Sequence, residues 1–228
     1  MNFSPTQIAS IVPAIMAGIA ISLLSCGDKA TDDYGVFDVY GRVVYRPALF
    51  ASSAEFYIYN NGEAVTGAII TVEEDVIPLV DSASGYYSLP LEIEIGDTLE
   101  YSVSSEFGSL YGNLIIPDTA QIIQPLEGDT LLFGLDFPAS WQRASEADGY
   151  YSYLENQAGF VAAVTEIYFD TTAILPGEYF FESGFDIFWL EALSGNIVRG
   201  VTPGGRILPR GVVSSAASFR EVYIDFAR

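Results

Sequence analysis

The chain has 228 residues, half of them hydrophobic, and it carries 30 acidic and 9 basic side chains, for a formal net charge of −21. It contains no histidine and a single cysteine. These counts exclude histidine-based catalytic triads, the usual zinc sites and an intramolecular disulfide. The apolar content is too high for a disordered acidic tail. The negative charge argues against a nucleic-acid partner, whose phosphates would be repelled.

Residues 1–25 have the pattern of an export signal. An apolar run without charge covers residues 8–24 and ends at Leu23-Leu24-Ser25-Cys26. Aliphatic and small residues in this order before a cysteine resemble the lipobox of bacterial lipoproteins. The resemblance implies a signal peptide of residues 1–25, cleavage before Cys26, and lipidation of its thiol with fatty acids such as palmitate. The protein would then be attached to a membrane through that lipid.

One feature departs from the usual export signal, because residues 1–7 contain no Lys or Arg. An uncleaved membrane helix is one alternative, since a run of about 17 apolar residues is at the short limit for a membrane span. In that case the cysteine would be incidental. A soluble chain is the other alternative. Residues 26–35 form a polar tether, and its Asp28, Asp32 and Asp33 resemble the signals that send some lipoproteins to the cell surface. We therefore expect a cell-envelope location, at the outer membrane or cell surface rather than the inner membrane.

Beyond the tether, apolar residues recur at every second position, which is the period of β-strands. Strands are predicted at 39–45, 55–59, 68–72, 91–95, 99–103 and 110–116. Asn60-Asn61-Gly62 between two of these runs predicts a hairpin turn, because Asn and Gly tolerate positive φ. Short strands without an amphipathic helix indicate a β-sandwich over residues 36–118. Residues 64–72, 81–89 and 95–103 resemble the carboxypeptidase-regulatory or transthyretin-like module, which implies the same fold.

A second module is predicted for residues 119–228. Its strands are expected at 122–130, with a Pro-Gly break inside this first one, and at 135–141, 149–154, 171–175, 185–192 and 218–226. Trp141 and the run Gly149-Tyr150-Tyr151 resemble the second and third strands of a fibronectin type III domain. Residues 180–185 lack that family's clear tyrosine corner, and residues 199–211 are long and Gly/Pro-rich for its usual loop. The predicted fold is all-β, with two tandem immunoglobulin-like β-sandwiches after the signal peptide.

Basic residues gather near the C-terminus, where residues 199–228 hold five arginines and two acids. Arg199, Arg206 and Arg210 on the Gly/Pro-rich loop could form a basic docking patch, or they could pair with acidic neighbours. Trp189 lies in a run that is apolar on both faces, which favours core or inter-domain packing but also allows a contact surface. Tyr151 and Tyr153 share one strand face and Tyr150 has the other, so these tyrosines are either half-buried or a ladder that binds glycan or protein.

Catalytic and cofactor sites are not expected. The acidic run Glu73-Glu74-Asp75 allows weak calcium binding, but no Asp-x-Asp-x-Asp-Gly loop or Gly-rich phosphate loop is present. A glycosidase would need two carboxylates that face each other across a cleft, and sequence alone does not show this.

The sequence therefore predicts a lipid-anchored cell-envelope protein with a non-enzymatic binding or structural role. Its partner would be an envelope protein or a glycan, and not nucleic acid. One alternative is an accessory subunit of a larger surface or secreted assembly. The last alternative is a carboxylate-dependent hydrolase.

Overall fold

The computed structural model describes residues 37–47, 50–156, 161–162, 167–177, 184–204 and 207–226. The predicted signal peptide, Cys26, the tether and Arg206 lie outside these residues. The described residues form strands β1 to β19 and contain no α-helix. The all-β prediction is therefore confirmed. Within the described residues, no helix is long and apolar enough to cross a membrane.

The N-terminal half, residues 37–118, contributes nine strands. They are β1 (Phe37–Tyr45), β2 (Ser53–Asn60), β3 (Glu63–Ala64), β4 (Ile69–Val72), β5 (Asp75–Val76), β6 (Leu79–Asp81), β7 (Tyr86–Pro90), β8 (Thr98–Ser105) and β9 (Gly108–Ile115). The predicted hairpin turn is present after β2, where Asn61 has φ 51° and Gly62 has φ 82°. Both angles lie in the region that Asn and Gly tolerate best.

The C-terminal half, residues 119–226, contributes the other ten strands. They are β10 (Gln121–Gln124), β11 (Thr130–Phe133), β12 (Phe137–Gln142), β13 (Gly149–Asn156), β14 (Val161–Ala162), β15 (Ile167–Tyr168), β16 (Thr172–Leu175), β17 (Gly184–Ser194), β18 (Val198–Val201) and β19 (Ile207–Phe226).

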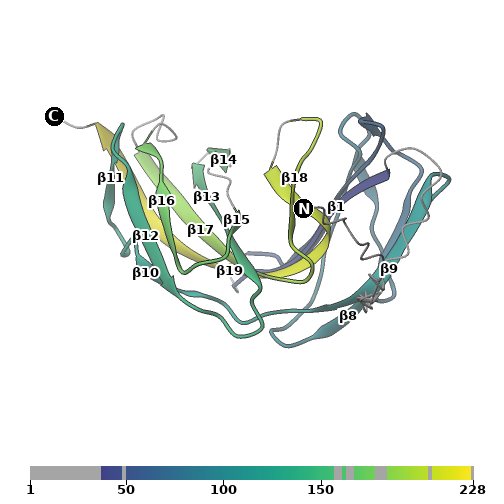
Figure 1. Cartoon of the computed structure of the whole chain (residues 1–228), viewed down its shortest axis with the longest axis horizontal. Coiled ribbons are helices and arrows are strands. Elements are labelled where there is room, and N and C mark those ends of the chain that lie inside the picture. Colours follow the sequence, from purple (N-terminus) through teal and green to yellow (C-terminus); the bar gives the residue numbers. More distant parts are fainter. Residues whose placement is uncertain are drawn as a thin grey trace, which may run out of the picture.

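One main sheet runs through both halves in the order β14-β13-β17-β19-β1-β2-β7-β6, with β3, β11, β15 and β18 attached. The long strand β19 makes this continuity, and Figure 1 shows it curving through the middle of the molecule, from β18 to the C-terminal end beside β11. Its residues 211–216 pair in parallel with β1, and its residues 214–224 pair antiparallel with β17. The predicted boundary near residue 118 stays a prediction, but the main sheet crosses it.

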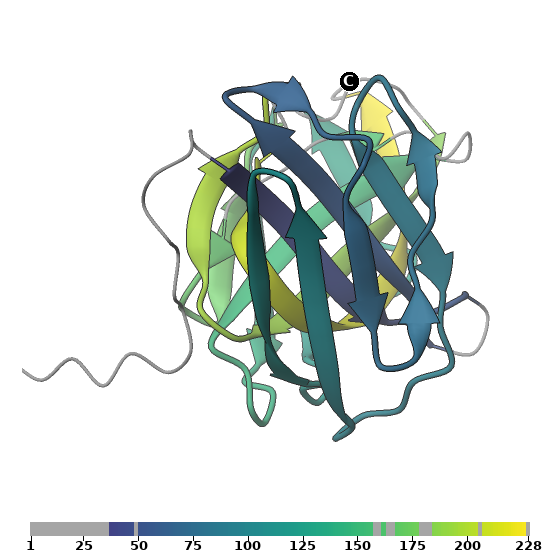
Figure 2. The ribbon, with the colours of Figure 1, turned by 90° about the vertical axis from the view of Figure 1, so that its right-hand side faces the viewer.

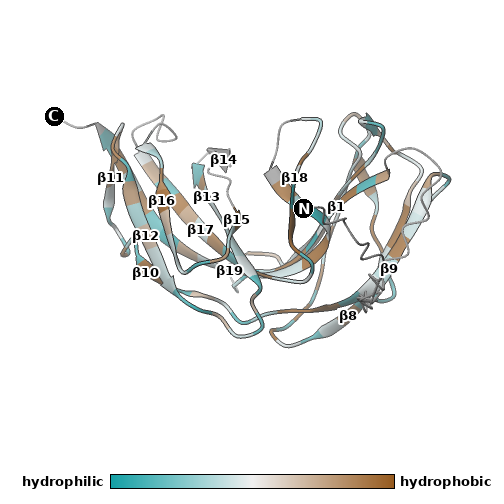
Figure 3. Cartoon of the chain, viewed as in Figure 1, coloured by the Kyte–Doolittle hydropathy of each residue, from teal (hydrophilic) through white to brown (hydrophobic). Residues whose placement is uncertain are grey.

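Two smaller sheets cover the convex side of the main sheet and complete the sandwiches. The sheet β5-β4-β8-β9 covers the N-terminal half, and the sheet β10-β12-β16 covers the C-terminal half. Figure 2 shows β8 and β9 in front of β1 and β19. Alternation along each strand sends one set of side chains into the core between the sheets, so hydrophobic and polar positions interleave in Figure 3. In β2, for example, Ala54, Phe56 and Ile58 are all fully buried.

The opposite side of the main sheet, which we call the concave face, also carries a hydrophobic cluster. It includes Tyr40 and Tyr59 from the N-terminal half and Tyr153 and Trp189 from the C-terminal half. The neighbours of Trp189 along β17, Phe188 and Leu190, point into the C-terminal core instead. A strand buried on both faces explains why the run around Trp189 is apolar throughout.

Parts of the strand prediction are wrong. The strand expected at 122–130 is two strands in different sheets, because β10 ends before Pro125, which has no backbone N–H to donate, and β11 begins at Thr130. Residues 91–95 form no strand, because Pro90 ends β7 and the chain then crosses towards the other sheet. Leu91 donates one backbone hydrogen bond to Ser52, and Ile95 is 40% exposed before the turn at Gly96.

Most of residues 199–211 belong to strands and not to a loop, since β18 and the start of β19 pair there as a hairpin. Pro209 is tolerated because, within the described part of the chain, this stretch of β19 pairs with β18 alone, which is an edge-like position.

Candidate functional site

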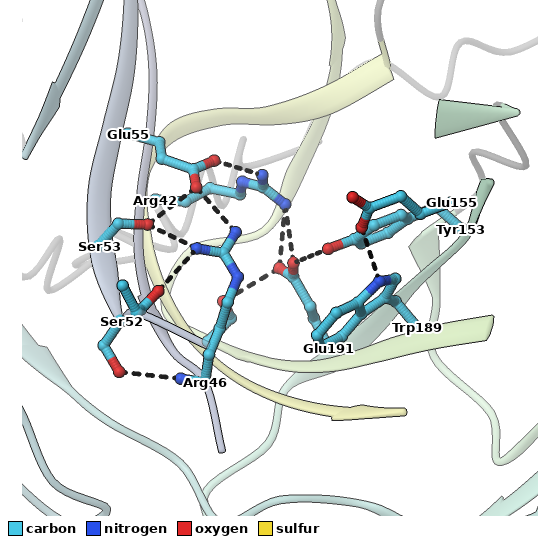
Figure 4. Close-up of polar contacts among 11 residues, drawn as sticks. Arg42, Arg46, Ser52, Ser53, Glu55, Tyr153, Glu155, Trp189 and Glu191 are labelled. Carbon is cyan, nitrogen blue, oxygen red and sulfur yellow. Dashed lines mark hydrogen bonds and ion pairs between the residues drawn. The ribbon is translucent and has the colours of Figure 1, made fainter. Parts of the chain in front are cut away.

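An ionic network of Arg42, Arg46, Glu55 and Glu191 occupies the middle of the concave face (Figure 4). Arg42 Nη1 lies 3.1 and 3.0 Å from the two carboxylate oxygens of Glu191, and its Nη2 lies 2.7 Å from Glu55 Oε2. Arg46 Nη2 lies 2.8 Å from Glu55 Oε1. Because Arg42 belongs to β1 and Glu191 to β17, the network joins the two halves of the molecule.

Neutral side chains complete the network around its two glutamates. Glu191, which is fully buried, also accepts hydrogen bonds from Tyr153 Oη at 3.3 Å and Ser215 Oγ at 3.0 Å. Ser53 Oγ donates to Glu55 Oε1 at 2.9 Å. The buried carboxylate of Glu191 therefore has several donors, as a charge held away from water requires.

Three groups at the network, Arg42, Glu55 and Tyr153, have pKa values shifted away from neutral pH. Burial by itself would raise the pKa of Glu55, but Arg42 and Arg46 outweigh it and lower that pKa to about 2. Burial would lower the pKa of Arg42, yet Glu191 and Glu55 hold it well above its usual value. Burial and then Glu191 raise the pKa of Tyr153 well above its usual value. None of these three groups exchanges a proton near neutral pH, so the network is best explained as a structural junction.

Aromatic side chains extend the junction beside the network. Phe50, from the segment between β1 and β2, packs edge-on against Trp189 at 4.8 Å and Phe219 at 5.4 Å between ring centroids. Trp189 Nε1 donates to Glu155 Oε2 at 2.9 Å, and the indole residue is 2% exposed. Trp189 thus packs between the two halves, in agreement with the interpretation that it serves core or inter-domain packing. It does not reach the surface as part of a contact patch.

A tyrosine-lined cleft of about 340 Å³ lies at one end of the concave face. We define the cleft by its lining residues, which are Tyr57, Tyr59, Asp81, Ser84, Tyr86, Thr202 and Gly204. Strands β2 and β7 supply the three tyrosines. Asp81 at the end of β6 and Ser84 in the turn after it supply one wall, and Thr202 and Gly204 after β18 supply the other. The volume falls in the range of about 300–1,000 Å³ that is typical of small-molecule sites.

Stacked rings form part of the floor of the cleft. Tyr57 and Tyr86 are cross-strand partners, and their rings stack with centroids 4.7 Å apart at 28°. Tyr59 follows on the same face of β2, is 5% exposed and meets Tyr40 edge-on at 6.1 Å. Rings held on neighbouring strands lose little further freedom when a ligand binds, so this floor is preorganised.

The wall opposite the hairpin carries a carboxylate. Asp81 accepts hydrogen bonds from Ser84 Oγ at 2.6 Å and from the backbone N–H of Ala83 at 3.0 Å. These bonds, that of Ser84 first, lower the pKa of Asp81. The cleft therefore presents a charged acceptor beside hydroxyl groups at neutral pH.

A larger hollow of about 530 Å³ lies beside the β12–β13 loop, but its lining contains no aromatic ring. The cleft is therefore the better candidate for a binding site, because it combines ring faces with convergent polar groups.

The structure places two of the three predicted basic residues, Arg199 and Arg210, on the hairpin next to the cleft. Arg199 lies on β18 and is exposed, while Arg210 on β19 forms an ion pair with Asp38. Arg206 follows Gly204 closely in the sequence and lies outside the described residues. Arg210 thus pairs with an acidic neighbour, which was one of the two alternatives for these arginines. A docking role for the arginines stays a prediction.

Metal binding at residues 73–75 gains no support. Among the described residues, no group of three or more His, Cys, Asp or Glu side chains could hold a metal ion. The Glu73 carboxylate accepts a hydrogen bond from the backbone N–H of Glu100.

Sequence reasoning missed the cleft, although part of its signal was present. Alternation in β2 separates Tyr57 and Tyr59 from Phe56 and Ile58, so two tyrosines had to share the face away from the core. What the sequence did not show was that Tyr86 would lie beside Tyr57.

No protein-family model and no curated protein matches this chain. Among solved structures, it is similar to the fibronectin(III)-like modules of Clostridium thermocellum CbhA at 8% identity, with 83% of this chain and 95% of that chain covered and a TM-score of 0.28. The Dpr11 IG1 complex with DIP-gamma IG+IG2 matches at 11% identity, 84% and 98% coverage and a TM-score of 0.25.

A third similar structure is SGBP-B from the Bacteroides ovatus mixed-linkage glucan utilization locus, in complex with a mixed-linkage heptasaccharide. It matches at 12% identity with a TM-score of 0.24, and the match covers 80% of this chain and 43% of that one. Likenesses at this level assign no function, and the β-sandwich fold follows from the strand pairing itself.

Proposed function

We propose that this protein is a lipid-anchored cell-envelope protein that binds a glycan in the tyrosine-lined cleft without catalysing a reaction. The observation that carries the proposal is the stacked pair of Tyr57 and Tyr86 beside the Asp81 carboxylate in one cleft.

The chemistry of a sugar ring suits these groups. A pyranose has an apolar C–H face, which packs against an aromatic ring, and hydroxyl groups at its edge that require hydrogen-bond partners. Tyr57 and Tyr86 supply the ring faces, while Asp81, Ser84 and Thr202 supply the polar lining. A binding role fits better than catalysis, because Arg42, Glu55 and Tyr153 of the ionic network do not exchange a proton near neutral pH.

The lipid anchor is supported by the lipobox Leu23-Leu24-Ser25-Cys26 at the end of the apolar run. The long acidic body that follows would then lie outside the cytoplasm, where glycans of the envelope or surroundings are accessible. The accessory-subunit alternative has no structural feature of its own in its favour.

Calorimetric titration of the full-length protein in detergent tests the binding proposal. The probes are neutral gluco-, xylo-, manno- and chito-oligosaccharides. We expect at least one to bind the wild type, and Tyr57→Ala and Tyr86→Ala to weaken that binding about tenfold or more, a change of roughly 1.4 kcal/mol. Tyr111→Ala is the matched control, because Tyr111 on β9 is 64% exposed and lies away from the cleft.

The binding proposal is wrong if no probe binds more tightly than about 1 mM, or if Tyr111→Ala costs as much as the cleft variants. For the anchor, cells are labelled with radioactive fatty acid, and we expect label on the wild type but not on Cys26→Ala. Equal labelling of the two would contradict lipidation at Cys26.

A further inference from the structure

Thr202 and Gly204 form one wall of the cleft and follow directly on β18. We call the hairpin that carries them, β18 with residues 207–210 of β19, the hairpin wall. The two strands pair antiparallel from Val198 opposite Arg210 to Val201 opposite Ile207. Thr202, next to the end of β18, lines the cleft and is 3% exposed. The position of the hairpin therefore sets the distance between Thr202 and the tyrosines on the floor of the cleft.

Tyr40 holds the hairpin wall against the main sheet. Its hydroxyl donates to the backbone oxygen of Val201 at 3.1 Å, across 161 positions of sequence. Tyr40 lies on β1, is 5% exposed, and is not among the residues that line the cleft. Burial, followed by the Asp38 charge, raises the pKa of Tyr40, so its hydroxyl remains a donor at neutral pH.

Gly200 allows this contact to be close. A Cβ added at Gly200 would lie 2.5 Å from Tyr40 Cε1 and 3.1 Å from Arg210 Cβ. Any larger residue would therefore have to push the hairpin away from the Tyr40 ring or displace the ring itself. The ion pair of Arg210 with Asp38 is a further attachment on β1, but about half of the arginine side chain is exposed, so it contributes little.

We infer that Tyr40 is a positioning residue, which fixes the hairpin wall at its distance from Tyr57 and Tyr86 through the hydrogen bond to Val201 and the packing on Gly200. The inference rests on the proposed glycan-binding function of the cleft. A hairpin that is less firmly held spends part of its time away from the binding position. The apparent Kd for the oligosaccharide then equals the intrinsic Kd divided by the fraction of molecules in which the hairpin is in the binding position.

Tyr40→Phe tests the inference because it removes the hydroxyl and keeps the ring. Tyr111→Phe is the matched control. The measurements on the full-length protein are hydrogen exchange of the β18 amides without ligand, thermal unfolding, and the Kd of the tightest oligosaccharide from the panel above. We expect faster exchange confined to the hairpin, a Kd raised about 2- to 10-fold, and a melting temperature close to that of the wild type.

Gly200→Ala provides a second test, since the added methyl group displaces the wall while the Tyr40 hydroxyl is kept. Gly67→Ala is its control, because a Cβ at Gly67 has nothing within 4 Å. We expect Gly200→Ala to weaken binding about tenfold or more. Its effect and that of Tyr40→Phe should not be additive in the double variant, because both act on one contact.

The inference is overturned if both variants leave the exchange of β18 and the Kd as in the wild type. It is also overturned if exchange rises throughout the molecule, since Tyr40 would then act on overall stability. If the wild type binds no oligosaccharide, the proposed function fails, and exchange of the hairpin still reports whether Tyr40 holds the wall.

Discussion

The ionic network and the cleft lie on the same face of the same sheet, yet they differ in how their polar groups are satisfied. In the network, Glu191 is fully buried and is bonded by Arg42, Tyr153 and Ser215 from three other strands. In the cleft, an exposed carboxylate, Asp81, stands beside ring faces and an open volume. Side chains that satisfy one another join the halves of the molecule, while side chains that face an open volume can take a ligand.

The largest expected effect comes from removing the buried end of the network. Glu191→Ala leaves Arg42 without its main partner in a site where the arginine side chain is 13% exposed. We expect a loss of about 3–5 kcal/mol in the free energy of unfolding, because Arg42 and Arg46 are then left with Glu55 as one shared carboxylate, and one largely buried positive charge is no longer balanced. Urea unfolding measures this loss.

Glu92→Ala is the control for that substitution, since Glu92 is exposed and should change stability by less than about 0.5 kcal/mol. Equal stability of the Glu191 and Glu92 variants would show that the network does not join the halves.

A pH dependence of intermediate size is expected from Glu55. Its pKa is about 2 in the folded protein against an ordinary value of 4.5. Because the folded value is the lower one, the stabilisation is complete above pH 4.5 and is lost as the pH falls from 4.5 towards 2. The loss amounts to roughly 3 kcal/mol, and urea unfolding at a series of pH values measures it.

Glu55→Gln isolates this contribution, because it cannot titrate. We expect the variant to be less stable than the wild type at neutral pH and to lose less stability on acidification. If both proteins lose the same amount between pH 5 and 2, another carboxylate is responsible.

The smallest effect on stability is expected at the cleft. Asp81→Asn keeps an acceptor for Ser84 and Ala83 but removes the charge, so unfolding should be almost unchanged. Oligosaccharide binding should weaken several-fold, because hydrogen bonds from hydroxyl groups to a charged acceptor are stronger than those to a neutral one. Calorimetric titration measures this, with Asp129→Asn, in a turn of similar hydrogen bonding, as control. A large loss of stability in Asp81→Asn would contradict this prediction and would show that Asp81 stabilises the fold.

Alternation of apolar residues determined most of the strands and their faces. Leu99 and Val103 point into the N-terminal core, and Trp141 is 2% exposed in the C-terminal core. Tyr150 packs in that core while Tyr151 and Tyr153 lie on the concave face. These features depend on side-chain direction along one strand, which local sequence specifies directly.

Only the tertiary structure decided how the halves join and where the cleft lies. Residues 207–217 contain Gly, Pro and many small residues, so their membership of the long strand β19 depends on pairing with β1, about 170 positions away. The contact of Arg42 with Glu191 spans 149 positions, and that of Tyr40 with Val201 spans 161. Local periodicity carries no information about which distant strands pair, because many pairings satisfy the same alternation. Packing and hydrogen bonding of the whole chain select one of them.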